Sequence, residues 1–243
     1  SVTIEVTNIA PSNPTAELWN GMTRMTPDSR GVYFAEEGDS IEFRGSAEDS
    51  ENDIDSLIHL WSPDAEDHPE IQHQSVGQHS TIEHMYTTAG LHLATLIVTD
   101  DDGANSETLT IAIEIVNLAP EIDPISNPLP VAEDSEISIS ASVWDTTGDI
   151  DTLQNCFDLD PEENSDGEGE ANDDCDLEGT IFVGSWPDAQ TAPSSLVFHT
   201  MDDDGERASV EIPISVNNVK PSAHLSVSNQ KPTEGDVVIL SAN

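Results

Sequence analysis

Residues 90–116 read GLHLATLIVTDDDGANSETLTIAIEIV, and this stretch decides the fold class. Apolar and polar residues alternate in LHLATLIVT and again in TLTIAIEIV, so each run can present one apolar face, as a half-buried strand does. Between the runs, three aspartates precede Gly103, a sequence typical of a hairpin turn. The stretch therefore predicts two consecutive antiparallel strands of a β protein.

The elements of this stretch recur along the chain, which indicates tandem repeats. DDDG returns at 202–205, again between two β-rich runs. The segments VTNIAP, IVNLAP and VNNVKP place three asparagines in register: Asn8, Asn117 and Asn218. After each of them comes a turn that carries a glutamate and leads into an alternating strand, at Glu37, Glu133 and Glu234. The sequence thus holds two full repeats and a truncated third.

The repeats predict the domain organisation. The chain has 243 residues, which fits two sandwich domains of about 100 residues each. We expect residues 1–8 to be the last strand of a preceding module and residues 219–243 to be the first strands of a following one. The two full domains are expected at 9–117 and 118–218, with an acidic insert at 158–178. On this interpretation the chain is part of a longer array.

The charge balance limits the classes of partner. Asp and Glu total 49 against 6 Lys and Arg, a formal net charge of -43, which excludes nucleic acid as a natural partner. Such a surface suits either concentrated salt or millimolar calcium, and composition does not choose between them. No apolar run approaches the roughly 18 residues that span a bilayer. No hydrolase, zinc-protease or nucleotide-binding motif is present, and we expect no enzyme.

Three segments of the first repeat carry a family resemblance. They are GSAEDSENDIDSLIHLW at 45–61, YTTAG at 86–90 and VTDDDGA at 98–104. They resemble the polycystic kidney disease (PKD) repeat, an immunoglobulin-like sandwich common in microbial surface proteins, secreted proteases and polysaccharide-degrading enzymes. In the second repeat Phe157 replaces the family's tryptophan. The resemblance implies an all-β fold of tandem immunoglobulin-like (PKD-like) β-sandwich domains in an extracellular protein, secreted or at the cell surface.

Immunoglobulin-like topology predicts where the acidic loops lie. The loop between the second and third strands and the hairpin between the last two strands share one pole, where the linker also enters. Carboxylates gathered there repel one another unless a cation intervenes, and calcium takes about six to eight oxygen ligands. Some repeats of the family bind calcium here. The predicted ligands are Asn8, Asp49, Asp53, Asp55, Asp100 and Asp102 in the first repeat, and Asn117, Asp145, Asp149, Asp151, Asp202 and Asp204 in the second. The alternative is that these loops merely face water.

A further acidic element lies between the only two cysteines, Cys156 and Cys175. In a secreted protein such a pair favours a disulfide over a zinc site, which would need more soft ligands at short spacing. The spacing of the enclosed oxygen-bearing side chains partly follows that of EF-hand-type calcium loops. The predicted ligands are Asn164, Asp166, Glu168, Asn172 and Asp174. The alternative is a disordered acidic loop.

The first repeat also has an insertion between Asn8 and Glu37 compared with the other repeats. It carries scarce cationic and apolar side chains, which predict contact with a partner or a neighbouring domain: Trp19, Met22, Arg24, Met25 and Arg30. A simple cover over a strand is the alternative. The five histidines between 59 and 84 lack the compact helical spacing of a transition-metal site. Trp61 stands at the family's core tryptophan and is expected to pack inside.

These features lead to three functional hypotheses. The first is a structural or adhesive repeat region, rigidified by calcium at the domain junctions, with neighbouring modules and a surface polysaccharide or protein as partners. The second is a spacer or carbohydrate-binding accessory region of a large secreted hydrolase. The third is a filament subunit that assembles by strand exchange.

Overall fold

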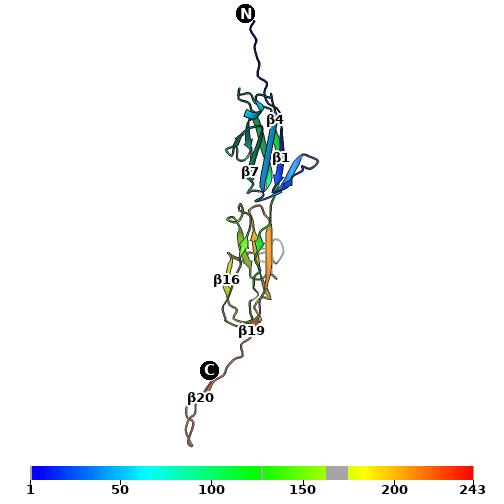
Figure 1. Ribbon diagram of the computed structural model, residues 1–243. Coiled ribbons are helices and arrows are strands. Elements are labelled where there is room, and N and C mark those ends of the chain that lie inside the picture. Colours follow the sequence, from blue (N-terminus) through cyan, green and yellow to red (C-terminus); the bar gives the residue numbers. More distant parts are fainter. Residues whose placement is uncertain (1, 127, 163–174, 243) are drawn as a thin grey trace. The chain divides into compact units, whose positions relative to one another are not determined.

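The computed structural model describes residues 2–126, 128–162 and 175–242 (Figure 1). In these ranges the chain is all-β, and the only helix is the short 3₁₀ turn η1 (Ile54–Ser56). The predicted fold class is confirmed. Contacts divide the chain into two compact units: Ser1–Pro124 with Ser142–Cys156 and His199–Val210, and Ile125–Ala141 with Phe157–Phe198 and Glu211–Asn243. The domain boundaries expected from the repeats stay a prediction.

The first repeat forms two sheets that enclose a core. One sheet has the order β2 (Thr23–Arg24), β1 (Ser12–Asn20), β4 (Ser40–Glu48), β7 (His79–Met85). The other has the order β3 (Val32–Glu36), β9 (Leu109–Val116), β8 (Gly90–Thr99), β5 (Ile58–Ser62), β6 (His73–Val76). Strands β8 and β9 pair antiparallel from Gly90 opposite Ile115 to Leu96 opposite Leu109, as residues 90–116 predict.

Trp61 lies at the centre of this core, which confirms its predicted packing role. It is fully buried, and its ring centroid lies 5.5 Å from that of Phe43. The indole N–H donates to Ser80 Oγ over 2.9 Å, so the one polar atom of the ring is satisfied. A Cβ at position 45 would lie 2.6 Å from the indole ring, which explains the glycine of the GSAED segment.

The second repeat is built from shorter strands. Its four-stranded sheet has the order β15 (Leu177–Glu178), β14 (Gln154–Asp158), β17 (Ser195–Met201), β18 (Arg207–Pro213). Three two-stranded pairs accompany it: β10 (Glu121–Ile122) with β13 (Val143–Trp144), β11 (Val131–Ala132) with β19 (Val216–Asn217), and β12 (Ile137–Ser140) with β16 (Ile181–Gly184). Phe157 is fully buried, and its ring centroid lies 4.9 Å from that of Phe198.

The last strands of the chain, its first residues and its disulfide complete the fold. Strands β20 (Leu225–Val227) and β21 (Leu240–Ala242) form a separate hairpin. Residues 2–11 form no strand. The assignment of residues 1–8 to the last strand of a preceding module stays a prediction. Cys156 and Cys175 are disulfide-bonded, as predicted.

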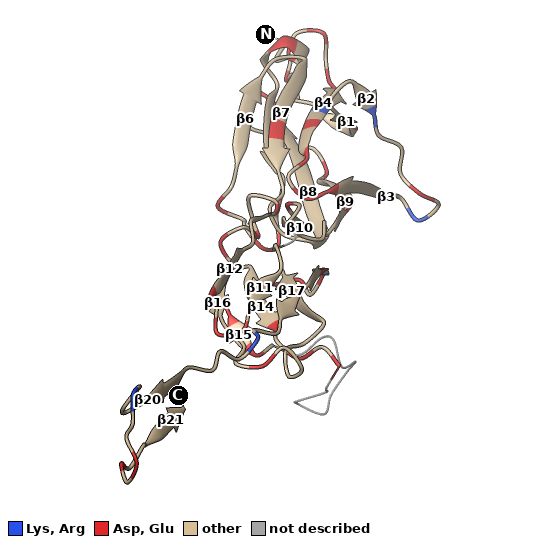
Figure 2. Ribbon diagram, turned by 90° about the horizontal axis from the view of Figure 1, so that it is seen from below, with Lys and Arg blue, Asp and Glu red and all other residues tan. Residues whose placement is uncertain are grey.

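Acidic residues occur throughout the described chain, whereas basic residues are confined to a few places (Figure 2). Across the described residues, no helix has the length and apolar character that crossing a membrane requires.

Candidate metal sites

The first predicted calcium pole brings the linker and the last hairpin together. Asn8 Nδ2 donates to Asp100 Oδ2 over 2.8 Å, and the Ala104 amide donates to Asp100 Oδ1 over 2.8 Å. Together with other backbone amides of the hairpin, the Asn8 contact holds the pKa of Asp100 below its ordinary value. In the loop after β4, Asp49 Oδ1 accepts from the Ser50 amide, and Asp53 Oδ2 accepts from Ser50 Oγ.

The second predicted pole repeats these contacts at equivalent positions. Asn117 Nδ2 donates to Asp202 Oδ2 over 3.0 Å, and the Glu206 amide donates to Asp202 Oδ1 over 2.8 Å. Asp145 Oδ1 accepts from the Thr146 amide, and Thr146 Oγ1 donates to Asp149 Oδ2. The same sequence signals therefore form the same pole in both repeats.

Each pole also contains one buried carboxylate oxygen that lacks a hydrogen-bond partner. Asp49 Oδ2 and Asp145 Oδ2 are buried without a hydrogen-bond partner. Burial, with the nearby charges of Asp149 and Asp202, raises the pKa of Asp145. Asp55, Asp102 and Asp151 are exposed. Within the described part of the chain, the carboxylates of the first pole do not form a group of three at metal-ligand spacing.

The second pole gains a carboxylate that the sequence patterns do not single out as a ligand. Single oxygens of Glu37, Asp149 and Asp204 all lie within 4.8 Å of one another, and all three residues belong to the first compact unit. Glu37 is only 3% exposed, and neither of its oxygens has a hydrogen-bond partner. Burial, contact with Asp149 and the charge of Asp204 raise the pKa of Glu37 to about 8. We refer to these three residues as the Glu37 cluster.

Backbone geometry fixes the Glu37 cluster. Glu37 lies in the turn between β3 and β4, where its amide donates to the carbonyl of Val116 and the Gly38 amide donates to that of Tyr86. Thr87, the residue after Tyr86, lies very close to Gly148. A Cβ at position 148 would overlap the Thr87 carbonyl oxygen. This approach requires a glycine, and it brings Asp149 to Glu37.

The acidic insert lies mostly outside the described residues. This holds for all of its predicted ligands: Asn164, Asp166, Glu168, Asn172 and Asp174. At its described base, oxygens of Asp158, Asp160 and Asp176 lie within 4.8 Å of one another, beside the disulfide. Asp176 Oδ2 accepts from the Leu159 amide over 2.8 Å. The calcium loop expected here stays a prediction.

Side chains of the insertion in the first repeat are largely engaged within the chain itself. The Arg44 guanidinium lies 4.2 Å from the centroid of the Trp19 ring, and Met25 packs against the core. Arg24 pairs with Glu17, and Arg30 pairs with Asp28. Met22, at 97% exposure, points into solvent. The strand-cover alternative therefore accounts for Trp19 and Met25, and the partner contact stays a prediction.

Comparisons with known proteins agree with this architecture. Residues 26–115 match the family model of the PKD domain. A search of curated proteins found no match.

Several solved structures are similar over part or most of the chain. The PKD domain of an M14-like peptidase from a Thermoplasmatales archaeon is 12% identical, covers 45% of this chain and 98% of its own, and has a TM-score of 0.33. The titin domains Z1Z2, solved in complex with telethonin, are 14% identical over 88% of this chain and 100% of their own, with a TM-score of 0.40. The fibronectin(III)-like modules of Clostridium thermocellum CbhA are 13% identical over 80% of this chain and 94% of their own, with a TM-score of 0.29. The family match identifies residues 26–115 as similar to a PKD domain, and the strand topology of the first repeat is that of an immunoglobulin-like β-sandwich.

Proposed function

We propose that this chain is a structural, non-catalytic repeat region of an extracellular protein, in which calcium joins the PKD domain to the repeat that follows it. The observation that carries the proposal is the Glu37 cluster. The disulfide between Cys156 and Cys175 supports the extracellular location, because such bonds persist in oxidising compartments.

The spacing of the Glu37 cluster suits calcium. Two oxygens bound to one calcium ion at about 2.3 to 2.6 Å lie at most about 5 Å apart. The oxygens of Glu37, Asp149 and Asp204 meet this limit. Calcium accepts irregular oxygen shells of about six to eight ligands, so water on the exposed side of Asp204 and the second carboxylate oxygens can complete the shell. Magnesium demands a smaller octahedral shell and should substitute poorly.

The electrostatics of the cluster point the same way. Burial, and then the closeness of Asp149 and Asp204, raise the pKa of Glu37, so this group favours a proton when no metal is bound. A divalent cation relieves the crowding of charge more fully, because one ion can neutralise two carboxylates. Calcium should therefore displace the proton of Glu37 as it binds.

A calcium ion bound to the Glu37 cluster would connect the two repeats. Glu37 belongs to the PKD domain at 26–115, whereas Asp149 and Asp204 belong to the second repeat. An ion held by all three would restrict motion between the two repeats. It would also stabilise the fold, since a ligand that binds only the folded state adds about 2.7 kcal/mol at a hundredfold excess over Kd.

Thermal unfolding with and without calcium tests this proposal. We expect millimolar calcium to raise the melting temperature of the wild type well above the value in chelator, and magnesium to raise it less. Glu37→Gln should lose most of the calcium-dependent rise. Glu36→Gln is the matched control, because Glu36 is the exposed neighbour and loses the same charge. Equal calcium responses in the two variants would exclude the Glu37 cluster as the site.

A further inference from the structure

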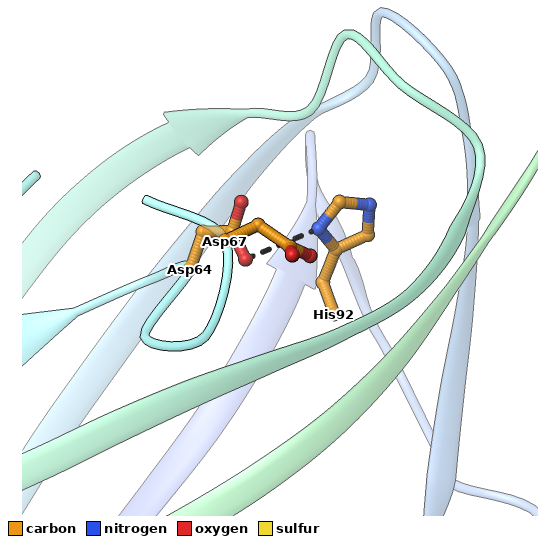
Figure 3. A group of neighbouring side chains, drawn as sticks. All are labelled: Asp64, Asp67 and His92. Carbon is orange, nitrogen blue, oxygen red and sulfur yellow. Dashed lines mark ion pairs between the residues drawn. The ribbon is translucent and has the colours of Figure 1, made fainter. Parts of the chain in front are cut away.

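A second, chemically different cluster lies where β5 ends and β8 begins. It consists of Asp64 and Asp67 from the loop after β5 and of His92 from β8 (Figure 3). One ligand atom of each residue lies within 4.8 Å of the others. Asp64 is 2% exposed and His92 is 5% exposed, whereas Asp67 lies at the surface. The cluster is thus a buried acid and imidazole with a third ligand on the solvent side.

Backbone contacts hold the loop of Asp64 against β8. The Ala65 amide donates to the carbonyl of Leu93 over 2.8 Å, and the Tyr86 hydroxyl donates to the carbonyl of Pro63 over 2.6 Å. These contacts flank Asp64 on both sides. The backbone that carries its carboxylate is therefore fixed before any ligand arrives.

The hydrogen bond of His92 determines which ring nitrogen faces the acid. His92 Nε2 lies 3.0 Å from the carbonyl oxygen of Thr88, and a carbonyl can only accept, so Nε2 carries the hydrogen. In the neutral ring Nδ1 then presents a lone pair. It faces Asp64 Oδ1 at 3.3 Å, another acceptor, and neither atom makes a hydrogen bond. Two facing acceptors in a buried site need a proton or a metal ion between them.

The geometry favours a metal ion over a proton. A charged N–H···O⁻ hydrogen bond is usually about 2.7 to 2.9 Å long, shorter than the 3.3 Å between Nδ1 and Oδ1. Two ligands bound tetrahedrally at about 2.0 to 2.1 Å lie about 3.3 to 3.4 Å apart. Metal-bound histidines typically donate their other N–H to a carbonyl or carboxylate, as His92 does to Thr88.

A second imidazole, that of His84, contacts the same tyrosine ring as His92. The Tyr86 ring lies between His84 and His92, with ring centroids 4.6 and 4.8 Å away. Burial, and then the neighbouring His73, lower the pKa of His84, which favours the neutral form of this ring. Asp67 adds a second carboxylate to the same point. An imidazole with two carboxylates is a ligand set typical of zinc and related transition metals, unlike the all-oxygen sets of calcium.

We propose that Asp64, Asp67 and His92 bind a divalent transition-metal ion of the zinc class, through His92 Nδ1 and one oxygen of each carboxylate. Water completes the shell on the exposed side of Asp67. The bound ion pins the loop after β5 to strand β8. This site is separate from the proposed calcium cluster, and its ligand chemistry differs.

Zinc titration of the full chain tests the proposal. Chelator-treated protein is titrated with zinc by calorimetry in saturating calcium, which occupies the all-oxygen sites. We expect one zinc site, weakened at least tenfold in Asp67→Asn, a surface change that leaves the core intact. Glu66→Gln and His68→Gln are the controls, because both neighbours are exposed and lie outside the cluster.

Two spectroscopic readouts identify the ligands directly. Cobalt in place of zinc should give the intense visible absorption of a tetrahedral site, and Asp67→Asn should abolish it. Zinc should also shift the NMR signals of the His92 ring and not those of the His68 ring. Absence of a saturable zinc site in the wild type would overturn the proposal. So would equal zinc affinity in Asp67→Asn and Glu66→Gln, or a shift of His68 in place of His92.

Discussion

Glu37 shows how one residue type at one repeat position can meet two different environments. Its counterpart in the second repeat, Glu133, accepts hydrogen bonds from the amides of Ala189 and Val219. Glu37 lies beside two aspartates, and the backbone of Leu118, at the position equivalent to Val219, is the one backbone group that favours its charged form. The same glutamate is therefore held by two backbone amides in one repeat and crowded by carboxylates in the other.

Replacement of Glu37 by Gln should have opposite effects with and without calcium. The pKa of Glu37 is near 4.5 ordinarily and about 8 in the folded protein. Without metal, its ionisation therefore destabilises the fold progressively as pH rises from 4.5 towards 8. In chelator at pH 8, Glu37→Gln should be more stable than the wild type, and the difference should vanish below pH 4.5. In excess calcium the order should reverse. Urea unfolding across this pH range measures both effects, and a variant less stable in chelator at pH 8 would contradict the raised pKa of Glu37.

Gly148 is the second residue on which the cluster depends. In Gly148→Ala the new methyl group meets the Thr87 carbonyl, and backbone atoms cannot rotate away as a side chain can. We expect a loss of about 1 to 3 kcal/mol in unfolding free energy, together with weaker calcium binding. Thr147→Ala, at the exposed neighbouring position, is the control. Denaturant unfolding of both variants provides the comparison, and a Gly148→Ala protein as stable as Thr147→Ala would show that the close approach does not persist in solution.

At the scale of elements, strand β5 combines core packing with a pH-sensitive group. His59 and Trp61 are both fully buried on this strand. Burial, and then the nearby His79, lower the pKa of His59 below its ordinary value of 6.5. The fold therefore keeps His59 neutral, and stability should fall as pH drops below about 6.5, where the unfolded chain takes up the proton.

Replacement of His59 by Leu should flatten this acid dependence. Between pH 7 and 5 the wild type should lose stability that the variant retains, because the variant has no proton to bind at this position. His224→Gln, at an exposed histidine, should behave like the wild type. Melting temperatures across this range supply the test, and parallel pH profiles for His59→Leu and the wild type would refute the assignment.

The sequence predicts local elements well and distant contacts poorly. Alternation and the DDDG turn are local, and they correctly predict the β8–β9 hairpin. The motif position of Trp61 correctly predicts a core residue, because a large aromatic side chain has few other places in a sandwich. The pairings of Asn8 with Asp100 and of Asn117 with Asp202 follow from topology once the repeats are aligned.

The residues that were missed depend on packing between segments far apart in the chain. Nothing local marks Glu37 as facing Asp149, or His92 as facing Asp64. The sequence feature that could have indicated Glu37 as a ligand is its position in a turn. This turn lies beside the last strand of the first repeat, and the acidic pole of the second repeat follows that strand. For His92 it is a histidine at an inward position of an otherwise apolar alternating strand.

For the molecule as a whole, a net charge of -43 makes any bound cation favourable, so general charge screening must be separated from a specific site. Charge screening depends on ionic strength, and removing any one carboxylate changes it equally. A site depends on particular oxygens. Raising the salt concentration should therefore weaken diffuse binding first and leave the Glu37 cluster occupied.

Calcium titration calorimetry at pH 7 and moderate ionic strength tests the central claim most directly. Binding should be saturable in the wild type and in Glu36→Gln, at least tenfold weaker in Glu37→Gln, and accompanied by proton release, detected as a dependence of the measured heat on the buffer's ionisation enthalpy. Absence of a saturable site, or equal affinity in Glu37→Gln and Glu36→Gln, would mean that calcium is not held between the PKD domain and the repeat that follows it.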